Sequence, residues 1–95
     1  MLPKNFRLNS NLIKYVLLNG EIVLKNEFFI IKGVCYESLN NSRFAIIVSK
    51  RVAKKSTQRN RIKRLIREWI KRNYILFSPG AYVVIARKYF SQLSN

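Results

Sequence analysis

The chain has 95 residues, which is enough for one domain with a modest hydrophobic core. Hydrophobic residues make up 48% of it, too many for a disordered basic tail. Nineteen Lys and Arg face only four acidic residues, so the formal net charge is +15. A compact chain with this charge repels itself and calls for a polyanionic partner, with nucleic acid as the first candidate and an anionic membrane surface as the second.

The apolar runs and the cysteine content bear on the compartment. No apolar run is long enough to span a bilayer, and the N-terminal region has no unbroken apolar core, so we expect neither a membrane span nor a signal peptide. The single cysteine, Cys35, has no partner within the chain, which indicates a reducing cytoplasm. Because Cys35 lies in an apolar run, we expect it in the core.

The first half of the chain predicts a short helix followed by three strands. Ile13, Val16 and Leu17 share one helical face, and Gly20 closes the helix. The expected ranges are 9–18 for the helix and 21–25, 28–36 and 43–49 for the strands. The second strand is apolar on both faces, which requires helices on both faces of the sheet or a ligand on one.

The second half predicts a long helix over residues 57–73 and a buried strand over 82–87. The helix carries one apolar stripe, formed by Ile62, Leu65, Ile66, Trp69 and Ile70. Together the elements indicate a single α/β domain over residues 1–95, an α+β two-layer sandwich with a four-stranded sheet in the order α-β-β-β-α-β and a short C-terminal helix. The helical crossover predicts that the last two strands are parallel neighbours.

Basic residues concentrate in one segment. Eleven of them lie between Lys50 and Arg72, against one acid, Glu68. On the long helix, Arg64 and Arg67 fall opposite the apolar stripe. Like charges at i,i+3 and i,i+4 spacing cost stability, so an ordinary solvated face is a poor explanation. Arginine in such a strip is typical of phosphate recognition.

Two other classes of protein fit the sequence less well. A membrane-surface or calmodulin-target helix leaves its apolar face free, whereas strands flank this one and can cover it. An independent nuclease needs a general base or metal ligands, but the chain has no histidine and its four acids are scattered. We therefore predict no catalytic residue and no metal site in this chain.

The segment Arg59-Asn60-Arg61-Ile62-Lys63-Arg64-Leu65-Ile66-Arg67 resembles the signature helix of the bacterial ribonuclease P protein family, and Ser49-Lys50 resembles the strand end that precedes it. Further similarities follow the same order along the chain. These are Leu2-Pro3-Lys4 at the start, Gly20 after the first helix and Val84-Ile85-Ala86-Arg87 in the last strand.

The resemblance implies a non-catalytic subunit that binds the catalytic ribonuclease P RNA and the 5′ leader of precursor tRNA, one protein per RNA, in the cytoplasm and without a membrane. It implies Mg²⁺ in the RNA-containing holoenzyme and no cofactor on the protein alone. The predicted RNA-binding residues are Lys50, Arg51, Lys54, Lys55, Arg59, Asn60, Arg61, Lys63, Arg64, Arg67 and Lys71. The family fold further implies a left-handed crossover, where general chirality rules predict a right-handed one.

The resemblance also implies a cleft for the single-stranded leader, between the first helix and one face of the sheet. Here the matching positions are Ile13, Leu17, Phe29 and Ile31. Three of these positions are aliphatic where the family usually has aromatic residues, so we expect weaker base stacking. The alternative function is a ribosomal or other structural RNA-binding protein.

Overall fold

A computed structural model describes residues 10–35 and 42–90 of the chain. It contains two α-helices, a short 3₁₀ helix and four strands. Their bounds are α1 Ser10–Asn19, β1 Glu21–Lys25, β2 Phe29–Cys35, β3 Ser42–Ile47, α2 Ser56–Asn73, η2 Tyr74–Leu76 and β4 Gly80–Ala86. The predicted helices and strands are confirmed, with ends within two residues of the expected ones. The short C-terminal helix was expected in the tail from Lys88 onward; residues 88–90 of that tail are not helical, and residues 91–95 lie outside the described residues.

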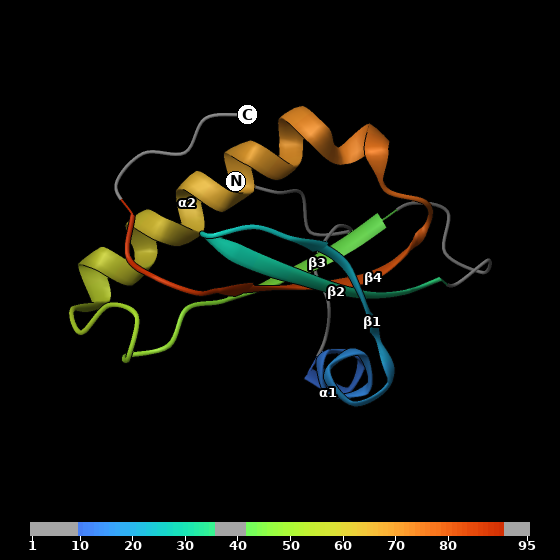
Figure 1. The fold of residues 1–95 in the computed structure, drawn as a ribbon, viewed down its shortest axis with the longest axis horizontal. Coiled ribbons are helices and arrows are strands. Elements are labelled where there is room, and N and C mark those ends of the chain that lie inside the picture. The colour runs from blue at the N-terminus through green and yellow to red at the C-terminus, as the bar shows by residue number, and fades with distance from the viewer. Residues whose placement is uncertain (1–9, 36–41, 91–95) are drawn as a thin grey trace.

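The four strands form one sheet in the order β1-β2-β4-β3. The last strand in the chain, β4, is inserted between β2, to which it is antiparallel, and β3, to which it is parallel. The predicted parallel pairing of β3 and β4 is therefore confirmed. With α2 above the sheet, both strands run leftward in Figure 1 and β3 lies behind β4, so the β3–α2–β4 crossover is left-handed, as the family resemblance implies.

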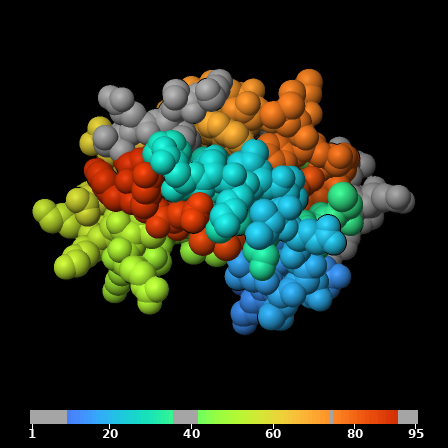
Figure 2. Space-filling view, viewed as in Figure 1, coloured from blue at the N-terminus to red at the C-terminus, as the bar shows by residue number. Residues whose placement is uncertain are grey.

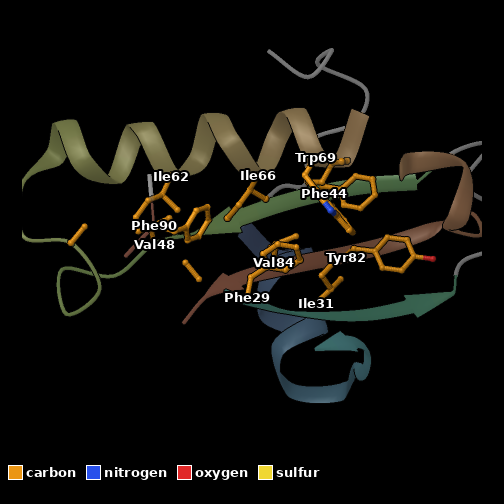
Figure 3. Close-up of a cluster of buried hydrophobic side chains, with 13 residues drawn as sticks. Phe29, Ile31, Phe44, Val48, Ile62, Ile66, Trp69, Tyr82, Val84 and Phe90 are labelled. Atoms are coloured by element: carbon orange, nitrogen blue, oxygen red, sulfur yellow. The ribbon is translucent and has the colours of Figure 1, made fainter. Parts of the chain in front are cut away.

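The helices lie on opposite faces of the sheet, α2 on one and α1 on the other, so the α+β fold has three layers and not the two that were expected (Figure 1). The main core fills the space between α2 and the sheet, and its largest members are aromatic (Figure 3). The ring of Phe29 meets Trp69 edge to face at 5.1 Å, and the ring of Phe44 stacks on Tyr82 at 5.3 Å. Such contacts add about 0.5–1.5 kcal/mol per pair to the burial of apolar area.

Tyr82 links the core to the turn before β4. Its ring lies against Gly33 of β2, where an added Cβ would come within 2.4 Å of the ring, so only glycine fits. Its hydroxyl donates a hydrogen bond of 2.6 Å to the carbonyl of Ser78, which also accepts one from the buried Ser42 hydroxyl. Burial raises the pKa of the Tyr82 hydroxyl, and the nearby Cys35 raises it further.

The α1 side of the sheet is packed more lightly. Val16 is the fully buried residue of α1, and it contacts Ala81 and Val83 of β4. The Nζ atom of Lys32 donates a hydrogen bond of 3.0 Å to the carbonyl of Leu17. A cation at this position satisfies a carbonyl in the last turn of the helix and complements the helix dipole.

Cys35 is exposed, so the expectation of a core cysteine is wrong. It is the last residue of β2 and pairs with Gly80, the first residue of β4. The apolar run in the sequence therefore extended one residue past the packed part of the strand.

Candidate nucleic-acid interface

The sequence of α2 separates an inner apolar stripe from an outer basic face. Ile62, Ile66, Trp69 and Ile70 are buried against the sheet, and Leu65 is partly buried beside them. The stripe predicted from helical spacing is therefore confirmed. Because the packed stripe holds the helix on the sheet, the opposite side chains point into solvent with a defined orientation.

The outer face of α2 is hollowed into a shallow groove, here called the α2 groove. It is lined by Thr57, Asn60, Arg61, Arg64, Arg67, Glu68 and Lys71. Five of these seven residues belong to the predicted RNA-binding set. Thr57 and Glu68 were not assigned, although the same i,i+3 and i,i+4 spacing would have identified them. Four cations within one groove create a positive potential that attracts phosphate.

The other predicted cations lie on the basic loop, residues 48–55, which joins β3 to α2. The side chains of Lys50, Arg51, Lys54 and Lys55 are exposed there. Two predicted residues of α2 are half-buried and lie outside the lining of the α2 groove, Arg59 and Lys63. The structure therefore places five of the eleven predicted residues in the groove and four on the loop, and it leaves Arg59 and Lys63 outside both groups.

A second surface lies on the other side of the sheet. Figure 2 shows a hollow between α1, in blue, and the yellow-green segment around the basic loop. Partly buried apolar side chains pack around Val16 on this side of the sheet, among them Ile13, Leu17, Ala45, Ile47 and Ile85. We call this surface the α1 hollow. Two residues predicted for a leader cleft, Ile13 and Leu17, belong to it.

The other two predicted cleft residues do not. Phe29 and Ile31 are fully buried in the core on the α2 side, where Phe29 contacts Trp69. Their assignment to a cleft beside α1 is wrong. Successive residues of a strand point to opposite faces, so Ile30 and Lys32 face α1 instead. The predicted cleft positions in β2 are one residue away from the positions that face α1, and a shift of one residue along a strand moves a side chain to the opposite face.

Two cations outside the predicted set lie at the end of the sheet that adjoins the basic loop. Ile47 pairs with Ile85 in parallel register, so the segments that follow β3 and β4 leave the sheet at the same end. Arg87 donates a hydrogen bond of 2.6 Å from Nη1 to the carbonyl of Asn26. The ammonium of Lys88 lies 3.5 Å from Glu27. Both cations are exposed beside the hairpin that joins β1 to β2.

Over the part of the chain that the structure describes, no three His, Cys, Asp or Glu residues gather as metal ligands. Within those same residues no helix has the length and apolarity needed to cross a bilayer.

Comparisons with known proteins agree with this arrangement. The family model described as Ribonuclease P matches residues 2–95. The Ribonuclease P protein component of Prochlorococcus marinus (strain MIT 9515) is 34% identical over 84 residues, covering 77% of this chain and 65% of that protein. Its counterpart from Pseudomonas aeruginosa (strain LESB58) is 40% identical over 57 residues, covering 60% of this chain and 42% of that protein.

Solved structures of ribonuclease P proteins have the same fold as this chain. The RNase P protein from Thermotoga maritima superimposes with a TM-score of 0.72 at 32% identity, covering 86% of this chain and 74% of that one. The RNase P protein of Staphylococcus aureus gives a TM-score of 0.76 at 27% identity, covering 87% of this chain and 75% of that one.

Fold and surfaces together define a class, a small basic α+β protein with a cationic helix over one sheet face and an apolar hollow on the other. Because the family model matches almost the whole sequence, the chain belongs to the ribonuclease P protein family. It spans less than two thirds of the length of the curated relatives described above, 65% of one and 42% of the other.

Proposed function

We propose that this chain is the protein subunit of ribonuclease P, which binds a catalytic RNA and assists removal of the 5′ leader from precursor tRNA. The observation that carries the proposal is the α2 groove. In this groove the chain, a member of the ribonuclease P protein family, presents four cations on a helix whose opposite face packs in the core: Arg61, Arg64, Arg67 and Lys71. A rigid cationic helix face fits the phosphate backbone of a folded RNA.

The α2 groove and the basic loop bind RNA in two ways. Guanidinium groups make charge-assisted, bidentate hydrogen bonds to phosphate oxygens, which explains the predominance of arginine in the groove. Asn60, exposed among the arginines, has an amide that can bond a ribose hydroxyl or a base edge. The lysines of the basic loop add point charges next to the groove. In this proposal the two groups form one continuous docking surface.

We assign the α1 hollow to the single-stranded leader. Its walls are aliphatic, so bases pack there by apolar contact, without the aromatic stacking that single-strand binding sites commonly use. Arg87 and Lys88 lie at the end of the sheet where the basic loop begins. A single-stranded RNA leader that leaves the hollow at this end meets cations that neutralise its phosphates.

Bond cleavage belongs, in this proposal, to the RNA partner and its bound Mg²⁺. The residues of this chain bind and orient the RNA and the leader. One protein acts per RNA, and the complex works in the cytoplasm.

Reconstitution tests the proposal. The chain is combined with a bacterial ribonuclease P RNA and a precursor tRNA at low magnesium, and cleavage is compared with that by the RNA alone. We expect the protein to restore cleavage at the mature 5′ end and to cleave nothing by itself. Cleavage by RNA-free protein, or no stimulation of the RNA, contradicts the proposal. Co-purification with ribosomal subunits, and not with one large non-ribosomal RNA, would favour the structural RNA-binding alternative.

The salt dependence of binding tests the docking surface. If six to eight cations meet phosphates, log K against log salt has a slope of roughly −4 to −7, from about 0.7–0.9 per contact. A slope shallower than about −2 would mean that the α2 groove and the basic loop are not the interface.

A further inference from the structure

The basic loop contains a compact turn, which is held by backbone hydrogen bonds and by Val48, Val52 and Ala53, whose side chains pack in or against the core. The carbonyl of Ser49 accepts hydrogen bonds from the amides of Val52, at 3.1 Å, and Ala53, at 3.2 Å. Ala53 is buried, whereas Lys50 and Arg51 at the tip of the turn are exposed. The turn therefore presents two adjacent cations to solvent from a short segment between β3 and α2.

Arg59 ties this turn to the first part of α2. Its Nη1 donates hydrogen bonds to the carbonyls of Ala53, at 3.0 Å, and Lys54, at 2.8 Å. The side chain is half-buried beneath the loop, in contrast to Arg61 and Arg64, which are exposed and line the α2 groove. One end of the Arg59 guanidinium is thus used inside the protein.

The loop needs such a tether for an electrostatic reason. It carries four exposed cations in six residues, Lys50, Arg51, Lys54 and Lys55, and their mutual repulsion favours an open loop. A hydrogen bond from a charged donor is roughly twice as strong as one between neutral groups, so two from one guanidinium oppose the repulsion directly.

We infer that Arg59 is a positioning residue: it fixes the basic loop against α2 so that Lys50 and Arg51 are held in place for a polyanion. The sequence pattern places Arg59 among the RNA contacts, whereas its hydrogen bonds make it part of the support for those contacts. The inference rests on the proposed function only for the identity of the polyanion.

The first test uses the free protein and no RNA. Amide hydrogen exchange is measured at Val52 and Ala53 in the wild type, in Arg59→Ala and in the control Arg61→Ala. We expect Arg59→Ala to speed exchange of these two amides by at least about fivefold while the amides of Ile66 and Val84 in the core stay unchanged. Arg61→Ala leaves all four unchanged. Unchanged exchange at Val52 and Ala53 in Arg59→Ala overturns the inference, whatever the protein binds.

The second test is a double-mutant cycle on binding to a ribonuclease P RNA. In the wild-type background Arg59→Ala should weaken binding by about tenfold, which corresponds to about 1.4 kcal/mol. In a protein that already carries Lys50→Gln and Arg51→Gln, Arg59→Ala should weaken binding by less than about twofold, because the cations it positions are gone.

The control Arg61→Ala should weaken binding by the same factor in both backgrounds. An equal effect of Arg59→Ala in both backgrounds means that Arg59 contacts RNA directly, which overturns the inference. General destabilisation of the fold would not depend on the charge of the loop tip, so the cycle separates positioning from a merely structural role. If the wild type does not bind the RNA at all, the proposed function fails while the exchange result on the loop still stands.

Discussion

The two faces of the sheet are covered in different ways, and the difference separates stability from binding. On the α2 side an 18-residue helix covers a core of aromatic and branched side chains, with Phe29, Ile31, Ile62, Ile66 and Ile70 fully buried. On the α1 side a 10-residue helix buries one residue completely, Val16, over the small side chains of β4. One face is closed, whereas the other leaves apolar surface beside the helix.

The unequal cover leaves two surfaces of different chemistry exposed on one small basic protein. On the closed side the helix packs on the sheet through buried side chains, so the surface that we propose for RNA is the outer face of α2, which is polar and cationic. The lightly packed side keeps part of its sheet surface accessible, and that surface is apolar. In the proposed function the first surface binds phosphates and the second binds bases.

The largest expected effect concerns the closed side. Phe29→Ala removes a fully buried ring from the contact with Trp69, so the free energy of unfolding should fall by about 3–5 kcal/mol. The matched change on the α1 side, Leu17→Ala, removes a partly buried side chain and should cost less than about 2 kcal/mol. Urea denaturation of both variants measures the difference. Equal losses would contradict the unequal packing of the two faces.

A smaller but still large effect is expected on the outer face of α2. Arg64→Ala with Arg67→Ala should weaken binding to the catalytic RNA by more than tenfold, since each charge-assisted contact contributes about 1.5–3 kcal/mol. The unfolding free energy should change little, because both side chains lie opposite the core. Binding titrations at fixed salt measure the effect. Normal RNA binding by a folded double variant would remove the α2 groove from the interface.

Two neighbouring isoleucines of β3 test the α1 hollow. Ile47 faces α1, whereas Ile46 packs against the core on the α2 side. Ile47→Ala should weaken binding of precursor tRNA with a long leader by about threefold to tenfold, through loss of about 1 kcal/mol of apolar contact, and leave binding of mature tRNA unchanged. Ile46→Ala should lower stability without any dependence on the leader. The leader assignment is wrong if both variants behave alike.

The smallest effect concerns the hydroxyl of Tyr82. Tyr82→Phe removes its hydrogen bond to the Ser78 carbonyl, which keeps the bond from Ser42, so the loss at neutral pH should be about 0.5–1 kcal/mol. Burial raises the pKa of this hydroxyl in the folded state, so as pH rises past 10 the unfolded chain loses the proton first. The wild type should then lose stability relative to the variant. Unfolding curves at pH 7 and above pH 10 test the sign.

Much of the fold follows from local patterns in the sequence. The stripe from Ile62 to Ile70 and the cations opposite it are a property of the 3.6-residue helical period, so they define both faces of α2 without reference to the rest of the chain. The predicted parallel pairing of β3 and β4 follows from the single helix between them. The cationic groove was predictable for the same reason, because spacing along one helix brings its residues together.

The tertiary structure alone decided which face of β2 belongs to which helix. Phe29 and Ile30 are equally apolar. In a strand that is apolar on both faces, the alternation of side chains does not show which face packs against which helix. That assignment is set by the pairing of β2 with β4, which is remote in sequence, and by the unequal cover of the two helices. The role of Arg59 was decided in the same way, since its two carbonyl partners become available only when the basic loop folds back onto α2. The sequence by itself determined the cationic face of α2 and the apolar stripe opposite it, because both depend on neighbours along the helix. The apolar hollow and the support of the basic loop depend on contacts that only the folded chain makes.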